Sequence, residues 1–187
     1  VAAADAAVTT QLMRPITNHF GSGSILRETW LAVRGMKVQD LTASANFPDR
    51  PNERALLPIF ETPMAGPGVD LYGARFRGYL HPPLTGSYTF WIAADDSAEL
   101  WLSPDDQPEN KRRICQAAEW SLSFRNWWHD SEQESSPIYL EAGRGYYIEA
   151  LHKEGGGGDF FSVAWQPPGS DLEVITGADL SPFQPSK

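Results

Sequence analysis

The sequence predicts an all-β fold, an antiparallel β-sandwich of the jelly-roll type with long surface loops and little helix. Aromatic and β-branched residues gather in short runs that alternate with polar residues, which is typical of half-buried strands. Turns rich in Gly and Pro separate these runs, and the chain holds 16 Gly and 15 Pro. No long stretch shows the apolar period of an amphipathic helix. We therefore expect about ten strands in two packed sheets.

The length of 187 residues fits one domain with a single core. A hydrophobic content of 41%, with seven Trp, excludes a disordered chain. Residues 1–22 are rich in Ala and Thr and are interpreted as an N-terminal tail or linker. Residues 23–184 are interpreted as the single folded domain.

The first elements are expected to be short. Residues 24–33 (SILRETWLAV) predict a strand, and VQDLTAS predicts a helical turn capped by Asp40 or Thr42. Residues 44–69 carry five prolines and no sustained period. We interpret them as a long surface connection that holds one short strand, ALLPIF.

From residue 70 the pattern becomes regular. In YGARFRGYL, Tyr72 and Phe76 fall on one face of a strand, and Arg75 and Arg77 fall on the other. SPIYLEAG and RGYYIEALHKE are interpreted as a hairpin turned at residues 142–145. The other predicted strands are GSYTFWIAAD, AELWLS, KRRICQAA, FFSVAW and one or two short strands within EVITGADLSPF.

Charge and cysteine content limit the partners. The net charge of −9 argues against nucleic acid, because a phosphate backbone needs clustered Lys and Arg. Cys115 is the only cysteine, so no internal disulfide can form, and we expect it to pack in the core. No apolar run approaches the roughly 20 residues of a membrane-spanning helix.

Asp95 and Asp96 stand between two apolar runs, YTFWI and ELWL. Asp is depleted from strands, and neighbouring strand residues point to opposite faces. One interpretation is a solvated Asp-Asp turn in a hairpin. The other is that the backbone leaves the pleat and both carboxylates converge on a cation. A second pair, Asp105 and Asp106, lies between prolines and is interpreted as turn chemistry.

Four glycines precede Asp159. GGGGD lacks the spacing of a nucleotide-binding loop, which leaves a tight turn or a loop that exposes carbonyl oxygens. Carbonyls and carboxylates are what Ca²⁺ prefers. Four scattered His and one Cys give no nitrogen or sulfur metal site. Adjacent acids do not supply the opposed carboxylates of a glycosidase, which would need Glu149 or Glu154 as the partner of the pair. No GxSxG occurs, and we expect no enzyme.

Trp127, Trp128 and His129 form the other notable cluster, in a polar segment without a clear period. Packing in the core accounts for at least one of the tryptophans. The functional alternative is an aromatic wall beside a sugar, since flat amphipathic rings suit the C–H face of a pyranose.

In combination, these segments resemble the protective-antigen-type (PA fourteen) domain family of bacterial toxins, glycosidases and adhesins. The resemblance rests on YGARFRGYLHPPLTGSYTFWIAADDSAELWLS, PIYLEAGRGYYIEALHKEGGGGDFFSVAWQPPG and LSPF, and it covers roughly residues 24–184. It implies a β-sandwich. In sugar-binding members a cis peptide joins the Asp pair, which ligates Ca²⁺. By this resemblance the ligands would be Asp95, Asp96, Gln133, Gly157 or Gly158 through a carbonyl, and Asp159.

The resemblance therefore implies a calcium-dependent lectin module of a secreted or surface-anchored bacterial adhesin. Vicinal hydroxyls of the glycan would complete the Ca²⁺ shell formed by Asp95, Asp96, Gln133 and Asp159. Surrounding residues would set selectivity, the candidates being Trp127, Trp128, His129 and His152. The alternative is a structural spacer domain whose loops Ca²⁺ stiffens. We expect glycan partners, no nucleic acid, no membrane span, an extracellular location and a monomeric module within a larger chain.

Overall fold

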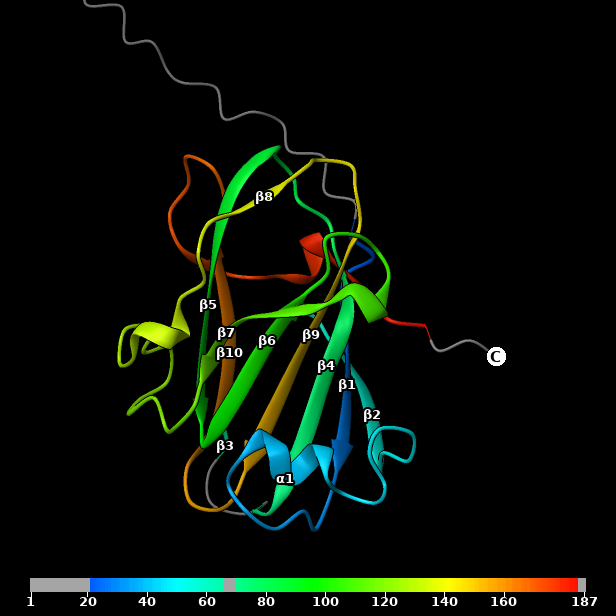
Figure 1. Cartoon of the computed structure of the whole chain (residues 1–187), viewed down its shortest axis with the longest axis vertical. Coiled ribbons are helices and arrows are strands. Elements are labelled where there is room, and N and C mark those ends of the chain that lie inside the picture. Colours follow the sequence, from blue (N-terminus) through cyan, green and yellow to red (C-terminus); the bar gives the residue numbers. More distant parts are fainter. Residues whose placement is uncertain (1–20, 66–69, 185–187) are drawn as a thin grey trace, which may run out of the picture.

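The computed structural model describes residues 21–65 and 70–184. Two antiparallel sheets pack face to face with their strands roughly along the long axis of the molecule, so the predicted β-sandwich is confirmed (Figure 1). Residues 1–20 of the predicted tail and residues 66–69 of the predicted connection lie outside the described residues.

The larger sheet has the strand order β2-β1-β4-β9-β6-β7, and β12 pairs with β4. Its strands are β1 (Ile25–Trp30), β2 (Glu53–Leu57), β4 (Tyr72–Leu80), β6 (Ser97–Leu102), β7 (Arg112–Ala117), β9 (Tyr146–Glu154) and β12 (Leu180–Pro182). Every pairing within it is antiparallel.

The smaller sheet has the order β11-β10-β5-β8, and β3 pairs with β10. Its strands are β3 (Glu61–Ala65), β5 (Gly86–Asp95), β8 (Ile138–Leu140), β10 (Asp159–Gln166) and β11 (Glu173–Val174). Three short 3₁₀ turns complete the described elements: Pro108–Asn110, Ser131–Gln133 and Gly177–Asp179.

The core lies between the sheets, where the alternation of each strand directs its apolar residues. Tyr72, Ala74 and Phe76 of β4 face inward as predicted, and Phe76 stacks on Phe161 of β10 with ring centroids 4.2 Å apart. The Cys115 thiol is buried, and burial raises its pKa far above the usual range, which suits packing. Within the described residues, no helix has the length and apolar character needed to span a membrane.

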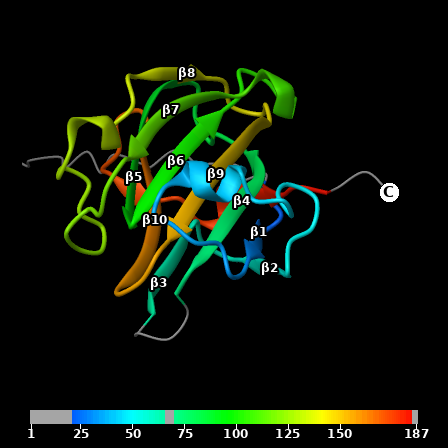
Figure 2. The ribbon, with the colours of Figure 1, turned by 60° about the horizontal axis from the view of Figure 1, so that its bottom comes forward.

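Helix α1 (Val38–Thr42) lies across the outer face of the larger sheet, over β4, β9 and β6 (Figure 2). Its Val38 and Leu41 pack on Trp30 and Leu151. The predicted cap was wrong: the N-terminal cap residue is Lys37, which precedes the helix in an extended conformation. Asp40, in the first turn, accepts a hydrogen bond from the Lys37 N–H at 2.9 Å. An acid in the first turn serves the unpaired N–H groups there without being the cap residue itself.

Two predictions about connectivity were wrong. The connection over residues 44–69 holds two strands, β2 and β3, one in each sheet, instead of one. Strands β8 and β9 do not form a hairpin, because β8 pairs with β5 while β9 pairs with β4 and β6. Local alternation identifies a strand, but the sheet that it joins depends on contacts distant in sequence.

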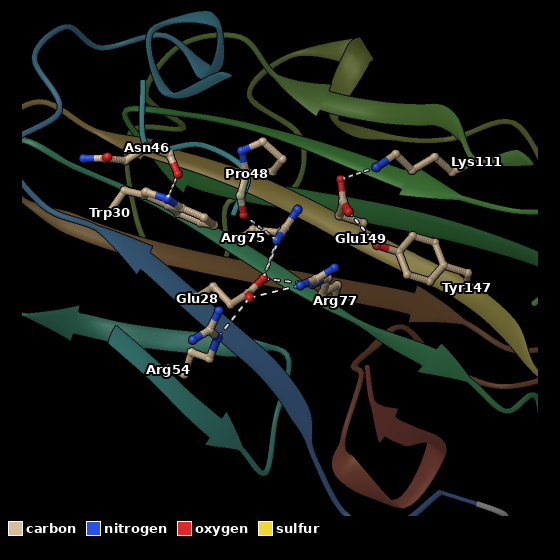
Figure 3. A network of polar contacts seen from close by, with 10 residues as sticks. All are labelled: Glu28, Trp30, Asn46, Pro48, Arg54, Arg75, Arg77, Lys111, Tyr147 and Glu149. Carbon is tan, nitrogen blue, oxygen red and sulfur yellow. Dashed lines mark hydrogen bonds and ion pairs between the residues drawn. The ribbon is translucent and has the colours of Figure 1, made fainter. Parts of the chain in front are cut away.

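Buried charges cross the outer face of the larger sheet (Figure 3). Glu28 of β1 is fully buried and lies opposite Arg54 of β2 and Arg75 of β4. Its carboxylate accepts hydrogen bonds from Arg75 and Arg77 at 2.8–3.0 Å and a longer one from Arg54 at 3.3 Å. Burial acts to raise the pKa of Glu28, but the hydrogen bonds and charges of Arg77 and Arg75 outweigh it, so this pKa is lowered.

Candidate cation site

The Asp95–Asp96 pair lies where the chain passes from one sheet to the other. Strand β5 of the smaller sheet ends at Asp95, and β6 of the larger sheet begins at Ser97. The two strands therefore do not form the hairpin that the turn interpretation assumed. The Asp95–Asp96 peptide is cis, as the family resemblance implies. The glycine loop 155–158 makes the second passage, from β9 to β10, at the same lower end of the molecule (Figure 1).

Three acids converge at this end. One carboxylate oxygen from each of Asp95, Asp96 and Glu154 lies within 4.8 Å of the other two. A second overlapping group joins Glu154 to Asp159 and a ring nitrogen of His152 with the same spacing. Glu154 is 0% exposed, and neither of its carboxylate oxygens has a hydrogen-bond partner among the described residues. A buried carboxylate without a donor is costly, which makes Glu154 a candidate ligand for a cation.

The acids disturb one another electrostatically. Burial, followed by the charges of Asp96 and Asp159, raises the pKa of Asp95 to about 6. Burial, followed by the charges of Asp96, Asp159, Asp95 and Asp70, raises the pKa of Glu154 to about 8. Burial also raises the pKa of Asp159, against a lowering effect of its hydrogen bond from Tyr72. Like charges brought together in this way are relieved by a cation.

The glycine loop approaches the acids closely. The Gly155 N–H donates to Oδ2 of Asp96 at 2.7 Å. A Cβ at Gly155 would lie 2.9 Å from that oxygen, and one at Gly158 would lie 3.1 Å from Oδ2 of Asp95. The Tyr72 hydroxyl, 2.8 Å from both carboxylate oxygens of Asp159, donates to that acid. A side chain at residue 155 would therefore displace Met36 or Asp96, and one at residue 158 would be in tight contact with Asp95.

Gln133 is not brought together with the acids. Its side chain is buried, and its amide nitrogen donates to the Ile92 carbonyl, the Asn126 carbonyl and the Ser121 hydroxyl at 2.8–3.1 Å. Its amide oxygen accepts from the Asp130 N–H at 2.9 Å. These bonds use the hydrogen-bonding capacity of the carboxamide, which fastens the segment 118–136 to β5. The sequence-predicted metal ligand is here a structural contact.

The four residues expected to set selectivity for a sugar differ in their exposure to solvent. Trp127 is 4% exposed and packs with Trp91 in a small cluster outside the smaller sheet, which matches the packing interpretation. Trp128 is 70% exposed and His129 is also exposed. His152 is fully buried, and its Nε2 donates to the Asp95 carbonyl at 2.7 Å. His152 therefore has no surface to offer a sugar, and that prediction was wrong.

Glu154 was considered from the sequence only as a glycosidase partner of the acid pair and was left out of the expected metal ligands, although a signal was present. Residues Tyr146, Ile148, Ala150 and His152 of β9 share one parity and face the core, and Glu154 continues that row. An acid on the apolar face of a strand needs a partner. That position, directly before the glycine loop, could have added Glu154 to the candidate ligands.

Among curated proteins, a mouse N-acetyl-beta-glucosaminyl-glycoprotein 4-beta-N-acetylgalactosaminyltransferase 1 is 34% identical over 157 residues. That match covers 79% of this chain but only 14% of the mouse protein. Mouse Fibrocystin-L is 36% identical over 85 residues, which are 46% of this chain and 2% of that protein. The chain thus corresponds to a small part of each relative.

Solved structures with the same fold include the "PA14 sugar-binding domain from RTX adhesin", with a TM-score of 0.64 at 12% identity, covering 86% of this chain and 99% of that one. Epithelial Adhesin 6 A domain from Candida glabrata, in complex with Galb1-3GlcNAc, gives 0.61 at 12% identity, covering 89% and 90%. An anti-sigma factor domain-containing protein from Clostridium clariflavum gives 0.64 at 17% identity, covering 90% and 50%. The PA14 domain family matches residues 60–177, well over half of the sequence. The chain belongs to the PA14 domain family.

Proposed function

We propose that this domain is a calcium-dependent carbohydrate-binding module that performs no chemistry of its own. The observation that carries the proposal is the convergence of Asp95, Asp96 and Glu154, with both Glu154 oxygens buried and unpartnered. An all-oxygen set of carboxylates beside a loop of glycine carbonyls fits Ca²⁺, which takes six to eight oxygen ligands. The crowding of negative charge supports the same ion.

The proposed Ca²⁺ ligands come from two crossings between the sheets, β5–β6 and β9–β10. Asp95, Asp96 and Glu154 would hold the ion from the two strand ends, and Asp159 and the carbonyls of Gly157 or Gly158 would approach it from the second crossing. Tyr72 orients Asp159 through its hydroxyl hydrogen bond. When bound, Ca²⁺ supplies coordination positions that vicinal hydroxyls of a sugar can complete. The exposed glycines 156–158 leave that side of the site open to a ligand.

Two arguments support glycans as the ligands of this domain: the coordination chemistry of the site and the ligands of proteins with the same fold. Structural relatives are described as a sugar-binding domain and as adhesin domains in complex with glycans, which supports glycans as the ligands. We place the domain in a secreted or cell-surface protein, such as an adhesin, where it acts as one module of a longer chain. The name of the mouse relative describes a glycosyltransferase, but the matched part is a small fraction of that protein.

The proposal is tested by calcium titration together with a glycan array. Wild type should bind Ca²⁺ in calorimetry, melt at a higher temperature with Ca²⁺ than with a chelator, and retain glycans only when Ca²⁺ is present. Asp96→Asn and Glu154→Gln should each lose the calcium response. Asp106→Asn, an exposed acid in the second Asp pair, is the matched control and should behave as wild type. Glycan binding that persists in chelator would refute the proposal.

A second candidate has its own observation. Asp95 and Asp96 are themselves buried, 9% and 6% exposed, which favours an ion enclosed by protein and used to stiffen the loops of a spacer domain. The same experiment separates the two functions. Thermal stabilisation by Ca²⁺ without any retained glycan would replace the lectin proposal with the structural one.

A further inference from the structure

A segment far from the acids in sequence forms part of the rim of the site. Residues Gly35 to Lys37 precede helix α1, and they lie outside residues 60–177, which match the PA14 family. Among them, Met36 is an exposed large apolar side chain, 58% accessible to solvent. A single exposed methionine on a surface loop is common and needs no explanation, but the position of Met36 relative to the acids does.

Met36 lies beside the acid pair. A Cβ placed on Gly155 would be 2.7 Å from Cγ of Met36 and 2.9 Å from Oδ2 of Asp96. The thioether side chain and the carboxylate therefore flank the same point above the glycine loop. The Gly35 carbonyl oxygen is 3.1 Å from that point as well. An apolar side chain thus stands next to a carboxylate that is proposed to hold Ca²⁺.

The structure fixes Met36 in this position. The Ser97 hydroxyl, next in sequence to the acid pair, donates to the Met36 carbonyl at 2.8 Å. The N–H of the same peptide group, that of Lys37, donates to Asp40 at 2.9 Å. Gly35 has φ of +92°, and a Cβ there would lie 2.1 Å from Oδ2 of Asp40, so only glycine lets the chain pass so close to α1. The peptide group between Met36 and Lys37 is therefore fixed through both its carbonyl and its N–H.

We propose that Met36 is a specificity-determining residue, the apolar wall against which a calcium-bound sugar lays its C–H face. This inference rests on the proposed function. A pyranose that directs vicinal hydroxyls to the ion also presents ring C–H groups, or a methyl group in a 6-deoxyhexose, beside the diol. A flexible, polarizable thioether suits such a surface. The ligand class is thus hexoses with an apolar patch next to the chelating diol.

The test compares Met36→Gln, which keeps the length of the side chain but makes its end polar, with Met36→Leu, which keeps it apolar. Sugar affinity is measured by calorimetry at saturating Ca²⁺ with the tightest binder among fucose, mannose, galactose and glucose. Ca²⁺ affinity is measured separately without sugar. Leu56→Gln, at an exposed leucine of β2, serves as the matched surface control.

Met36→Gln should weaken sugar binding about fivefold to tenfold, the range for losing one partly exposed apolar contact. Its Ca²⁺ affinity and melting temperature should stay at wild-type values, since the residue is exposed and does not ligate. Met36→Leu should bind within about twofold of wild type. Sugar affinity unchanged in Met36→Gln overturns this inference and leaves the proposed function standing. Absence of any calcium-dependent sugar binding by wild type overturns both.

Discussion

Glu28→Gln is the sharpest test of the buried charge network. The wild-type carboxylate is 0% exposed and receives hydrogen bonds from Arg75 and Arg77 at 3.0 Å or less. The substitution keeps the volume, but it replaces one acceptor oxygen with a donor group that faces guanidinium N–H groups. The substitution also removes the negative charge that balances the Arg75 and Arg77 guanidinium groups. Water cannot easily replace it, because these two side chains are only 9% and 14% exposed.

Breaking a buried ion pair by removing one partner costs about 3–5 kcal/mol. For a chain of 187 residues this corresponds to a decrease in melting temperature of roughly 10 °C. Chemical denaturation at pH 7 measures the free energy directly, and calorimetry measures the melting temperature. Glu141→Gln is the control, because Glu141 pairs with Arg144 on the surface, where both side chains are about half exposed. That change should cost less than about 1 kcal/mol.

The pH dependence provides a second check with a defined sign. The pKa of Glu28 is lowered in the folded state, so its contribution is present above the unfolded pKa and is lost as pH falls through the folded pKa. The stability difference between wild type and Glu28→Gln should therefore be constant near neutral pH and shrink at pH values below about 4. A neutral-pH difference no larger than that of Glu141→Gln would refute the reasoning.

Three further predictions concern the loop and the site. Gln133→Leu should destabilise the fold by about 2–3 kcal/mol, because it leaves the Asp130 N–H and the Ile92 carbonyl without their buried partner. It should also speed proteolysis within residues 118–136. An unchanged rate of digestion would contradict the role of Gln133 in holding this segment on β5. Trp127→Ala should cost about 3–5 kcal/mol in urea denaturation, whereas Trp128→Ala at an exposed position should cost under about 0.5 kcal/mol, and equal losses would contradict this assignment. Burial lowers the pKa of His152 to about 4 in the folded state, so protonation in the unfolded state should reduce the free energy of unfolding as pH falls from about 6.5 towards 4. The difference in this free energy between wild type and His152→Gln should therefore narrow across that range. A difference that stays constant with pH would contradict the prediction.

Much of the fold could be predicted from the sequence because alternation is a local property. Strand β4 was identified with its inward and outward faces, and β5 and β6 were placed on either side of the acid pair. The pairing of β8 with β5 could not be predicted, because a three-residue strand carries too little pattern to choose a sheet. The crossing between sheets at Asp95 and Asp96 could not be predicted for another reason, because alternation identifies β5 and β6 but does not show which strands they pair with.

The candidate site was predicted where the residue type itself is unusual. Two adjacent acids between apolar runs, and four glycines before Asp159, drew attention without any structure. Gln133 and His152 were assigned by resemblance or by proximity in sequence, and both turned out to be buried within the fold. Glu154 shows the opposite case, since its role depends on which face of β9 it occupies and on β5 and β6 beyond it.

Two of the crossings between the sheets, β5–β6 and β9–β10, bear on the mechanics of the domain. The β5–β6 junction carries Asp95 and Asp96, and the β9–β10 junction has Glu154 on one side and Asp159 on the other. The proposed ion would link both junctions and so connect the two sheets at this end of the sandwich. Force that pries the layers apart must then remove the ion before the core can open. If the proposed ion binds, the domain should be harder to pull open at calcium concentrations well above the dissociation constant than in chelator.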